Sequence, residues 1–105
     1  MTTTVYDAID TFITAGKVSA PDAQNLLSLY SSKVQAQLIC AMYVGRDHIH
    51  DTELKEPGEN YIGYTDHISA EDYSQIIYEK NVNVRTYLEK IMECARNSGF
   101  DLTRL

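Results

Sequence analysis

At 105 residues the chain is long enough for one domain with its own core and too short for two, so we expect a single domain, residues 1–105. Hydrophobic residues make up 44% and charged residues 23%, a composition that is typical of folded proteins and argues against a disordered chain. The net charge of -6 repels phosphate groups, which argues against direct binding to nucleic acids or anionic membranes.

Clear start signals precede the first two predicted helices. Thr4 comes before a helical repeat of apolar residues, Val5 to Ile13, and Gly16 follows its end. Ser19 precedes a proline and an acid, the residues that favour the first turn of a helix. We therefore predict one amphipathic helix before Gly16 and a second from Ala20 to Tyr30.

The longest apolar run in the chain, Leu38 to Val44, decides the fold class. It could form a buried strand, but the pattern continues upstream and no second strand candidate is present, so we favour a helix that is apolar on all sides. Such a helix is what the centre of a bundle requires. Ser31 or Ser32 would start it, with Gln35 completing a Ser-x-x-Gln capping box, and Gly45 would weaken or end it.

The helical pattern fails from His48 to Ile68, where a Pro-Gly pair marks a turn. Connections longer than about 12 to 15 residues usually bind something or are disordered. Ser69 with Asp72 opens a fourth predicted helix. Asn81 or Asn83 opens a fifth, which Gly99 closes, leaving a short tail of residues 100–105. The expected fold is an all-α, single-domain bundle of about five helices with a long central loop.

The two cysteines, Cys40 and Cys94, both lie within apolar helical patterns. Such positions indicate reduced, buried thiols rather than a disulfide framework. The longest apolar run is also far shorter than the ~20 residues that cross a bilayer, and residues 1–10 lack the pattern of a signal peptide. We therefore expect the protein in the cytoplasm.

Acidic residues exceed basic ones only in the middle of the sequence. Between Arg46 and Lys80 there are nine acids and three bases, whereas the rest of the chain has six of each. This distribution favours a basic partner or a cation as ligand. The alternative is a solvated face that aids solubility.

Tyrosine is unusually common, with eight residues against two phenylalanines and no tryptophan. Three tyrosines lie on or beside the predicted apolar stripes and are expected in the core: Tyr43, Tyr73 and Tyr87. Three others fall off these stripes: Tyr61, Tyr64 and Tyr78. Aromatic residues amid acids are typical of a docking patch. The alternative for Tyr61 and Tyr64 is that they pin the central loop to the bundle.

One segment, Arg46-Asp47-His48-Ile49-His50-Asp51, is dense in groups that can bind metals, and Asp66 and His67 could join it from the other end of the loop. Imidazole and carboxylate suit zinc, iron or manganese. His48 and His50 are two residues apart, so they converge only if the segment is extended. The alternative is a polar helix end, where a histidine interacts favourably with the helix dipole.

Motifs of the common enzyme classes are absent from the sequence. It contains neither a Gly-x-Ser-x-Gly elbow nor a glycine-rich phosphate loop, and Cys40 lies among apolar residues, where the pKa of a thiol rises. The crowded acids around Asp47 and Asp51 should stay ionised and solvated. We therefore lean toward a protein that is not an enzyme, and we predict no cofactor.

The stretch Gln35 to Asp47, with Tyr87-Leu88-Glu89 further on, resembles an uncharacterised family of small bacterial helical domains. In that family a helix ends in an aromatic residue, an aliphatic residue and Gly-Arg, and a closing helix carries a similar Tyr-Leu-Glu. The resemblance covers about residues 25 to 95, and the middle loop departs from the family's helical middle. It implies a helical fold and no activity, and it makes Gly45, Arg46 and Asp47 the first positions of interest.

Our leading hypothesis is a non-enzymatic regulator or inhibitor that docks on another protein, one with a basic surface, through residues 46–80. A phage or mobile-element factor that blocks a host nucleic-acid machine is one sub-case. The candidate binding residues are Arg46, Asp47, Tyr61, Tyr64, Asp66 and Tyr78. The alternative is a metal-dependent enzyme or sensor that uses His48, His50, Asp51 and His67. A self-associating bundle that forms a homodimer is a third possibility.

Overall fold

The computed structural model describes residues 3–55, 61 and 65–105. These residues contain no strand, which confirms the predicted all-α bundle of five helices. The helices are α1 (Val5–Ala15), α2 (Ala20–Leu27), α3 (Ser32–Asp47), α4 (Tyr73–Lys80) and α5 (Asn83–Ser98). Two short 3-10 helices, η2 (Ala70–Asp72) and η3 (Leu102–Arg104), precede α4 and end the chain.

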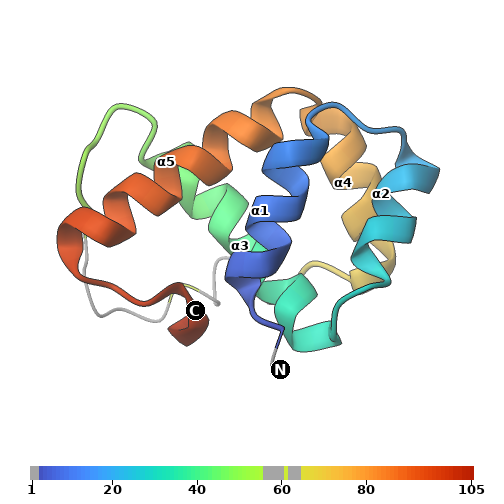
Figure 1. Cartoon of the computed structure of the whole chain (residues 1–105), viewed down its shortest axis with the longest axis horizontal. Helices are drawn as coiled ribbons and strands as arrows, with labels where there is room; N and C mark the ends of the chain where they lie inside the picture. Colours follow the sequence, from blue (N-terminus) through green and yellow to red (C-terminus); the bar gives the residue numbers. More distant parts are fainter. Residues whose placement is uncertain (1–2, 56–60, 62–64) are drawn as a thin grey trace.

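The helices are arranged around α3, which packs mainly against α5 and also against α1 (Figure 1). A second pair, α2 with α4, lies side by side at one end of the molecule. The N- and C-terminal ends lie on the same side, where η3 contacts α1. Every helix in the described ranges falls short of the length and apolar character that a bilayer crossing requires.

The predicted start signals of the first helices form hydrogen-bonded caps. The Thr4 hydroxyl accepts from the backbone N–H of Tyr6, and the Asp7 carboxylate accepts the Thr4 backbone N–H at 2.8 Å. Ser19 caps α2 by accepting from the backbone N–H of Asp22. These bonds satisfy N–H groups that have no partner inside a helix, and they fix where α1 and α2 begin.

The apolar run Leu38 to Val44 is helical and forms the middle of α3, as predicted. All of its residues except Tyr43, which is half-buried, lie in the core. Both Cys40 on α3 and Cys94 on α5 are free and buried, which also agrees with the prediction. A helix buried on nearly every side needs neighbours all round, and α1 and α5 supply two of them.

The connection between α2 and α3 differs from the prediction. α2 ends at Leu27 rather than Tyr30. The predicted Ser-x-x-Gln capping box at the start of α3 is wrong. Ser31 caps α3 by accepting from the backbone N–H of Val34. The Gln35 amide instead donates to the carbonyl groups of Leu27, at 2.8 Å, and Tyr30, at 3.0 Å. The Leu27 carbonyl also accepts the backbone N–H of Tyr30 at 3.0 Å, so Gln35 adds a second hydrogen bond there and connects α3 to the end of α2.

The prediction that Gly45 weakens or ends the central helix is wrong, because α3 continues through it to Asp47. Gly45 is buried where α3 contacts α5. A Cβ atom at this position would lie 2.8 Å from the carbonyl carbon of Tyr87, with no room between the two backbones. The missing side chain is thus what allows the two long helices to approach.

The last residues are part of the packed structure rather than a free tail. Gly99 ends α5 in the left-handed conformation, as predicted, with φ of 67°. Leu102 is fully buried. The Tyr6 hydroxyl accepts from the backbone N–H of Leu102 at 2.8 Å and donates to the Asp101 carboxylate at 3.3 Å. Tyr6 of α1 therefore holds the C-terminal end against the first helix.

Candidate docking surface

A hollow of about 550 Å³ opens between α3 and α4. Its lining comes from α3, from the segment before η2, from η2 and from α4: Tyr43, His67, Ile68, Ser69, Asp72, Gln75, Ile76 and Glu79. We call this feature the α3–α4 hollow. Asp72, Gln75, Ile76 and Glu79 recur at helical spacing, so they share one face of η2 and α4.

The α3–α4 hollow combines apolar and acidic groups. Its apolar members, Tyr43, Ile68 and Ile76, are half-buried and pack against the core. Asp72 and Glu79 are exposed. A surface with apolar area beside solvated carboxylates suits a ligand that is both cationic and partly apolar.

A cation already lies over the aromatic ring in this region. The Lys80 ammonium nitrogen is 5.2 Å from the centre of the Tyr43 ring, within the range of a cation–π interaction. Lys80 is at the end of α4, one residue beyond Glu79. A positive group of the same chain therefore already lies over the Tyr43 ring.

Tyr78 lies on α4 beside the hollow, as an exposed aromatic residue. Its exposed fraction is 49%, and it follows Gln75 by one helical turn, so the two side chains are neighbours on the helix surface. Asp66 and Glu71 are also exposed. Across residues 65–80 the sequence has four acids and one base, Lys80. The α3–α4 hollow together with Tyr78, Asp66 and Glu71 is called the α4 surface below.

Arg46 and Asp47 are exposed at the end of α3. Asp47 follows Tyr43 by one helical turn, so it lies on the side of α3 that carries the hollow. The Lys55 ammonium donates to the Asp47 carbonyl at 3.2 Å and lies 3.6 Å from the Asp51 carboxylate. The predicted binding residues on α3 therefore adjoin the α4 surface, although they do not line its hollow.

Tyr61 is not an exposed anchor, because only 2% of its surface is accessible. Its ring makes edge contacts with His48 and Phe100, at centroid distances of 6.4 and 6.2 Å. Its carbonyl accepts a hydrogen bond from the Cys40 thiol at 3.1 Å. Tyr61 thus follows the alternative prediction of a residue that holds the loop to the bundle. Tyr64 lies outside the described residues.

His48 is a buried hydrogen-bonding residue at the end of α3, with 2% of its surface accessible. Its Nδ1 lies 2.7 Å from the Val44 carbonyl oxygen, and its Nε2 accepts the backbone N–H of Lys55 at 3.0 Å. Because Nε2 accepts, the proton is on Nδ1, which donates to Val44. Both ring nitrogens therefore already have partners within the protein.

The other predicted metal ligands do not join His48. His50 and His67 are exposed, and Asp51 is half-exposed near Lys55. No three histidine, cysteine or acidic side chains converge on a common point in the part of the chain that the structure describes. His67 instead lines the α3–α4 hollow.

The buried cysteines are poor candidates for a nucleophile. Burial raises the pKa of the Cys40 thiol from its ordinary value of 9.0 to about 11, and a hydrogen bond with Thr65 only partly opposes this. Burial also raises the pKa of Cys94. Since the thiolate is the reactive form, both groups stay protonated and unreactive near neutral pH.

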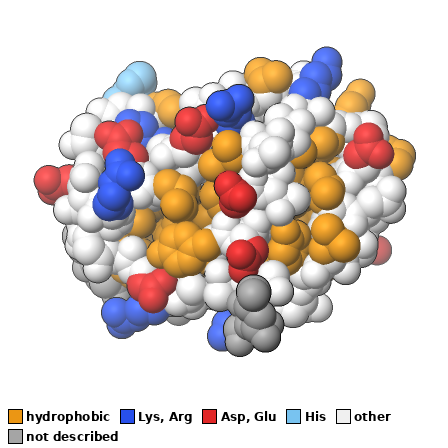
Figure 2. Space-filling model, viewed as in Figure 1, with side chains coloured by type: hydrophobic (Ala, Val, Ile, Leu, Met, Phe, Trp, Pro, Cys, Tyr) orange, Lys and Arg blue, Asp and Glu red, His pale blue; other side chains and the backbone are white. Residues whose placement is uncertain are grey.

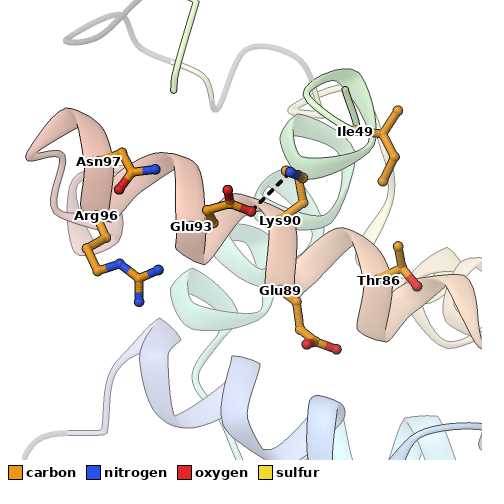
Figure 3. A pocket seen from close by; sticks show the side chains of 7 residues that line it. All are labelled: Ile49, Thr86, Glu89, Lys90, Glu93, Arg96 and Asn97. Carbon is orange, nitrogen blue, oxygen red and sulfur yellow. Dashed lines mark hydrogen bonds and ion pairs between the residues drawn. The ribbon is translucent and has the colours of Figure 1, made fainter. Parts of the chain in front are cut away.

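A second hollow, of about 460 Å³, lies on the outer face of α5 beside Ile49. Its charged residues are two acids and two bases, Glu89, Glu93, Lys90 and Arg96 (Figure 3). Lys90 donates to Glu93 at 3.0 Å and to the Asp51 carbonyl at 2.8 Å. These charges are balanced and partly satisfied within the protein, so this hollow offers less selectivity for a charged partner than the α4 surface.

The face of the molecule that carries α1 has both hydrophobic and acidic side chains (Figure 2). Hydrophobic side chains are visible on either side of α1, and acidic side chains lie between these two areas. Asp7 and Asp10 of α1 are both exposed. Acidic groups therefore also occur outside residues 46–80, but without an exposed tyrosine among the described residues of α1.

The sequence does not predict the hollow, because Tyr43, one of its apolar members, lies on or beside an apolar stripe and is expected in the core. It is half-buried instead. Its chain neighbours Met42 and Val44 are buried, so periodicity alone cannot tell an inward residue from one at the margin. A weak signal existed, since Tyr43 and Asp47 are spaced one turn apart.

Comparison of the chain with protein-family models, curated proteins and solved structures finds no match.

Proposed function

We propose that this protein is a non-enzymatic regulator or inhibitor that acts in the cytoplasm and docks on another protein through the α4 surface. The partner carries a basic surface with apolar residues. The fold supplies a rigid platform, because α4 is anchored in the core by Tyr73 and Ile77 and packs beside α2.

The observation that carries this proposal is the exposure of Tyr78 beside an acidic hollow. Scattered exposed apolar residues need no explanation, but an exposed tyrosine next to a concave surface has the composition of a binding hot spot. Tyrosine contributes a large contact area with few rotatable bonds. The excess of acids around it favours a basic partner and disfavours acidic ones.

Capture of partners from a lysate of the organism that encodes the chain tests this function. Tyr78→Ala should remove a protein that the unaltered chain retains, while the helical circular dichroism stays unchanged. Leu29→Ala is the matched control, because Leu29 is 68% exposed but lies outside residues 46–80. Equal retention of the same proteins by both variants would contradict the proposal.

A further inference from the structure

We infer that the α3–α4 hollow binds an arginine side chain of the partner, with the guanidinium group over the Tyr43 ring and near the carboxylates of Asp72 and Glu79. This inference rests on the proposed docking function and names the chemistry of the same surface. It follows from the composition of the hollow, from the contact that Lys80 makes there and from the geometry of a guanidinium group.

The composition of the hollow selects for positive charge. Among the residues that the structure describes, its lining contains two carboxylates and no lysine or arginine. The apolar residues Tyr43, Ile68 and Ile76 can cover the hydrocarbon part of a long basic side chain, while the charged end stays near Asp72 and Glu79. A negatively charged or purely apolar ligand would leave these carboxylates repelled or desolvated.

Lys80 shows that the ring face accepts a cation, and it also competes for that position. Its ammonium nitrogen lies 5.2 Å from the Tyr43 ring centre, on a flexible and half-exposed side chain. An arginine side chain that enters the hollow must share the Tyr43 ring with Lys80 or displace the Lys80 ammonium group from it. Removal of the Lys80 charge should therefore strengthen binding of a second cation at the Tyr43 ring.

Arginine fits this arrangement better than lysine does. A guanidinium group is planar, stacks on an aromatic ring and can donate to two carboxylates at once. An ammonium group is a compact point charge that is more strongly hydrated. The hollow offers both an aromatic face and two acids, which matches the guanidinium group.

A titration with N-acetylarginine N-methylamide, followed by amide and tyrosine-ring NMR shifts, tests the inference without the partner. We expect saturable shifts confined to residues around Tyr43, Asp72 and Glu79. Tyr43→Leu should weaken binding about 2- to 5-fold, the range for a cation–π contact at an exposed site, and Tyr43→Phe should restore it. Lys80→Met should strengthen binding by a similar factor.

Three outcomes would overturn the inference. One is a set of shifts spread equally over Glu89 and Glu93 of α5, the second is binding that Tyr43→Leu does not weaken, and the third is equal binding of the corresponding lysine derivative. Because the titration needs no partner, it is independent of the capture experiment. If capture depends on Tyr78 but the titration fails, the docking function stands and the arginine site is wrong. If the titration succeeds and capture fails, the hollow binds a guanidinium group and the docking function proposed through Tyr78 is wrong.

Discussion

Gly45 of α3 lies directly against the backbone of Tyr87 of α5, and a methyl group at Gly45 would overlap the Tyr87 carbonyl group. The two longest helices of the described structure thus approach at a position where only glycine fits. This approach brings the core faces of α3 and α5 together and so maintains the bundle on which the α4 surface is carried.

Gly45→Ala should destabilise the protein by about 1 to 3 kcal/mol, because the added methyl group forces the two backbones apart. Helix propensity alone predicts the opposite, a gain of about 1 kcal/mol, since alanine favours a helix more than glycine does. Urea unfolding followed by circular dichroism measures the difference. A more stable variant would show that the two helices are not in close contact at this point.

His48→Leu should cost about 1 to 3 kcal/mol of the free energy of unfolding, because the Lys55 N–H and the Val44 carbonyl lose their imidazole partner. The backbone amide of Lys55 should also exchange its hydrogen faster with solvent. His50→Leu is the matched control, since His50 is exposed, and it should change neither quantity measurably. An unchanged exchange rate at Lys55 in His48→Leu would contradict the hydrogen bond.

Alkaline pH should lower stability in part through Cys40. The unfolded chain ionises this thiol above pH 9.0, whereas the folded chain keeps its proton up to a pKa of about 11. The free energy of unfolding therefore falls as the pH rises through this interval, by at most about 3 kcal/mol from this group. Cys40→Ala should be less stable at pH 8 but should lose less stability between pH 9 and 11.

The comparison of slopes isolates Cys40 from other groups. Burial also raises the pKa values of Cys94, Tyr6 and Tyr73, and these groups lower stability in the same direction in both proteins. Urea unfolding under reducing conditions at several pH values gives both slopes. Parallel slopes for the two proteins would mean that the Cys40 thiol is not shielded from solvent.

Truncation should destabilise the protein strongly at Tyr61 and hardly at all at Tyr78. Tyr61→Ala empties a core position between His48 and Phe100 and should cost about 3 to 5 kcal/mol. Tyr78→Ala changes an exposed position and should stay within about 0.5 kcal/mol of the unaltered protein. Thermal unfolding of both variants checks this contrast, and similar melting temperatures would place Tyr61 at the surface.

Local sequence signals predicted the helices well where capping chemistry is local. Thr4, Ser19 and Gly99 act within one turn of their own position, and the run Leu38 to Val44 has no polar residue that would place one face in water. The prediction that Gly45 weakens or ends the helix was wrong, because the role of this glycine depends on a contact with Tyr87, which is far away in the sequence.

The candidate surface was only partly predictable for the same physical reason. The excess of acids and the exposure of Tyr78 could be inferred from charge counts and from the position of Tyr78 off the apolar stripe. The sequence left Tyr61 open between a docking residue and one that holds the loop, because its segment has no periodicity. Its partners come from α3 and its end, Cys40 and His48, and from Phe100 after α5.

Site-specific photo-crosslinking tests most directly whether the α4 surface docks on a protein. A benzophenone side chain would be placed at Gln75, which is exposed on the edge of the α3–α4 hollow, and separately at Gln24, which is exposed on α2. In a lysate of the source organism, we expect a discrete crosslinked partner from position 75 and not from position 24. Identical products from both positions, or none from position 75, would contradict the proposed docking surface.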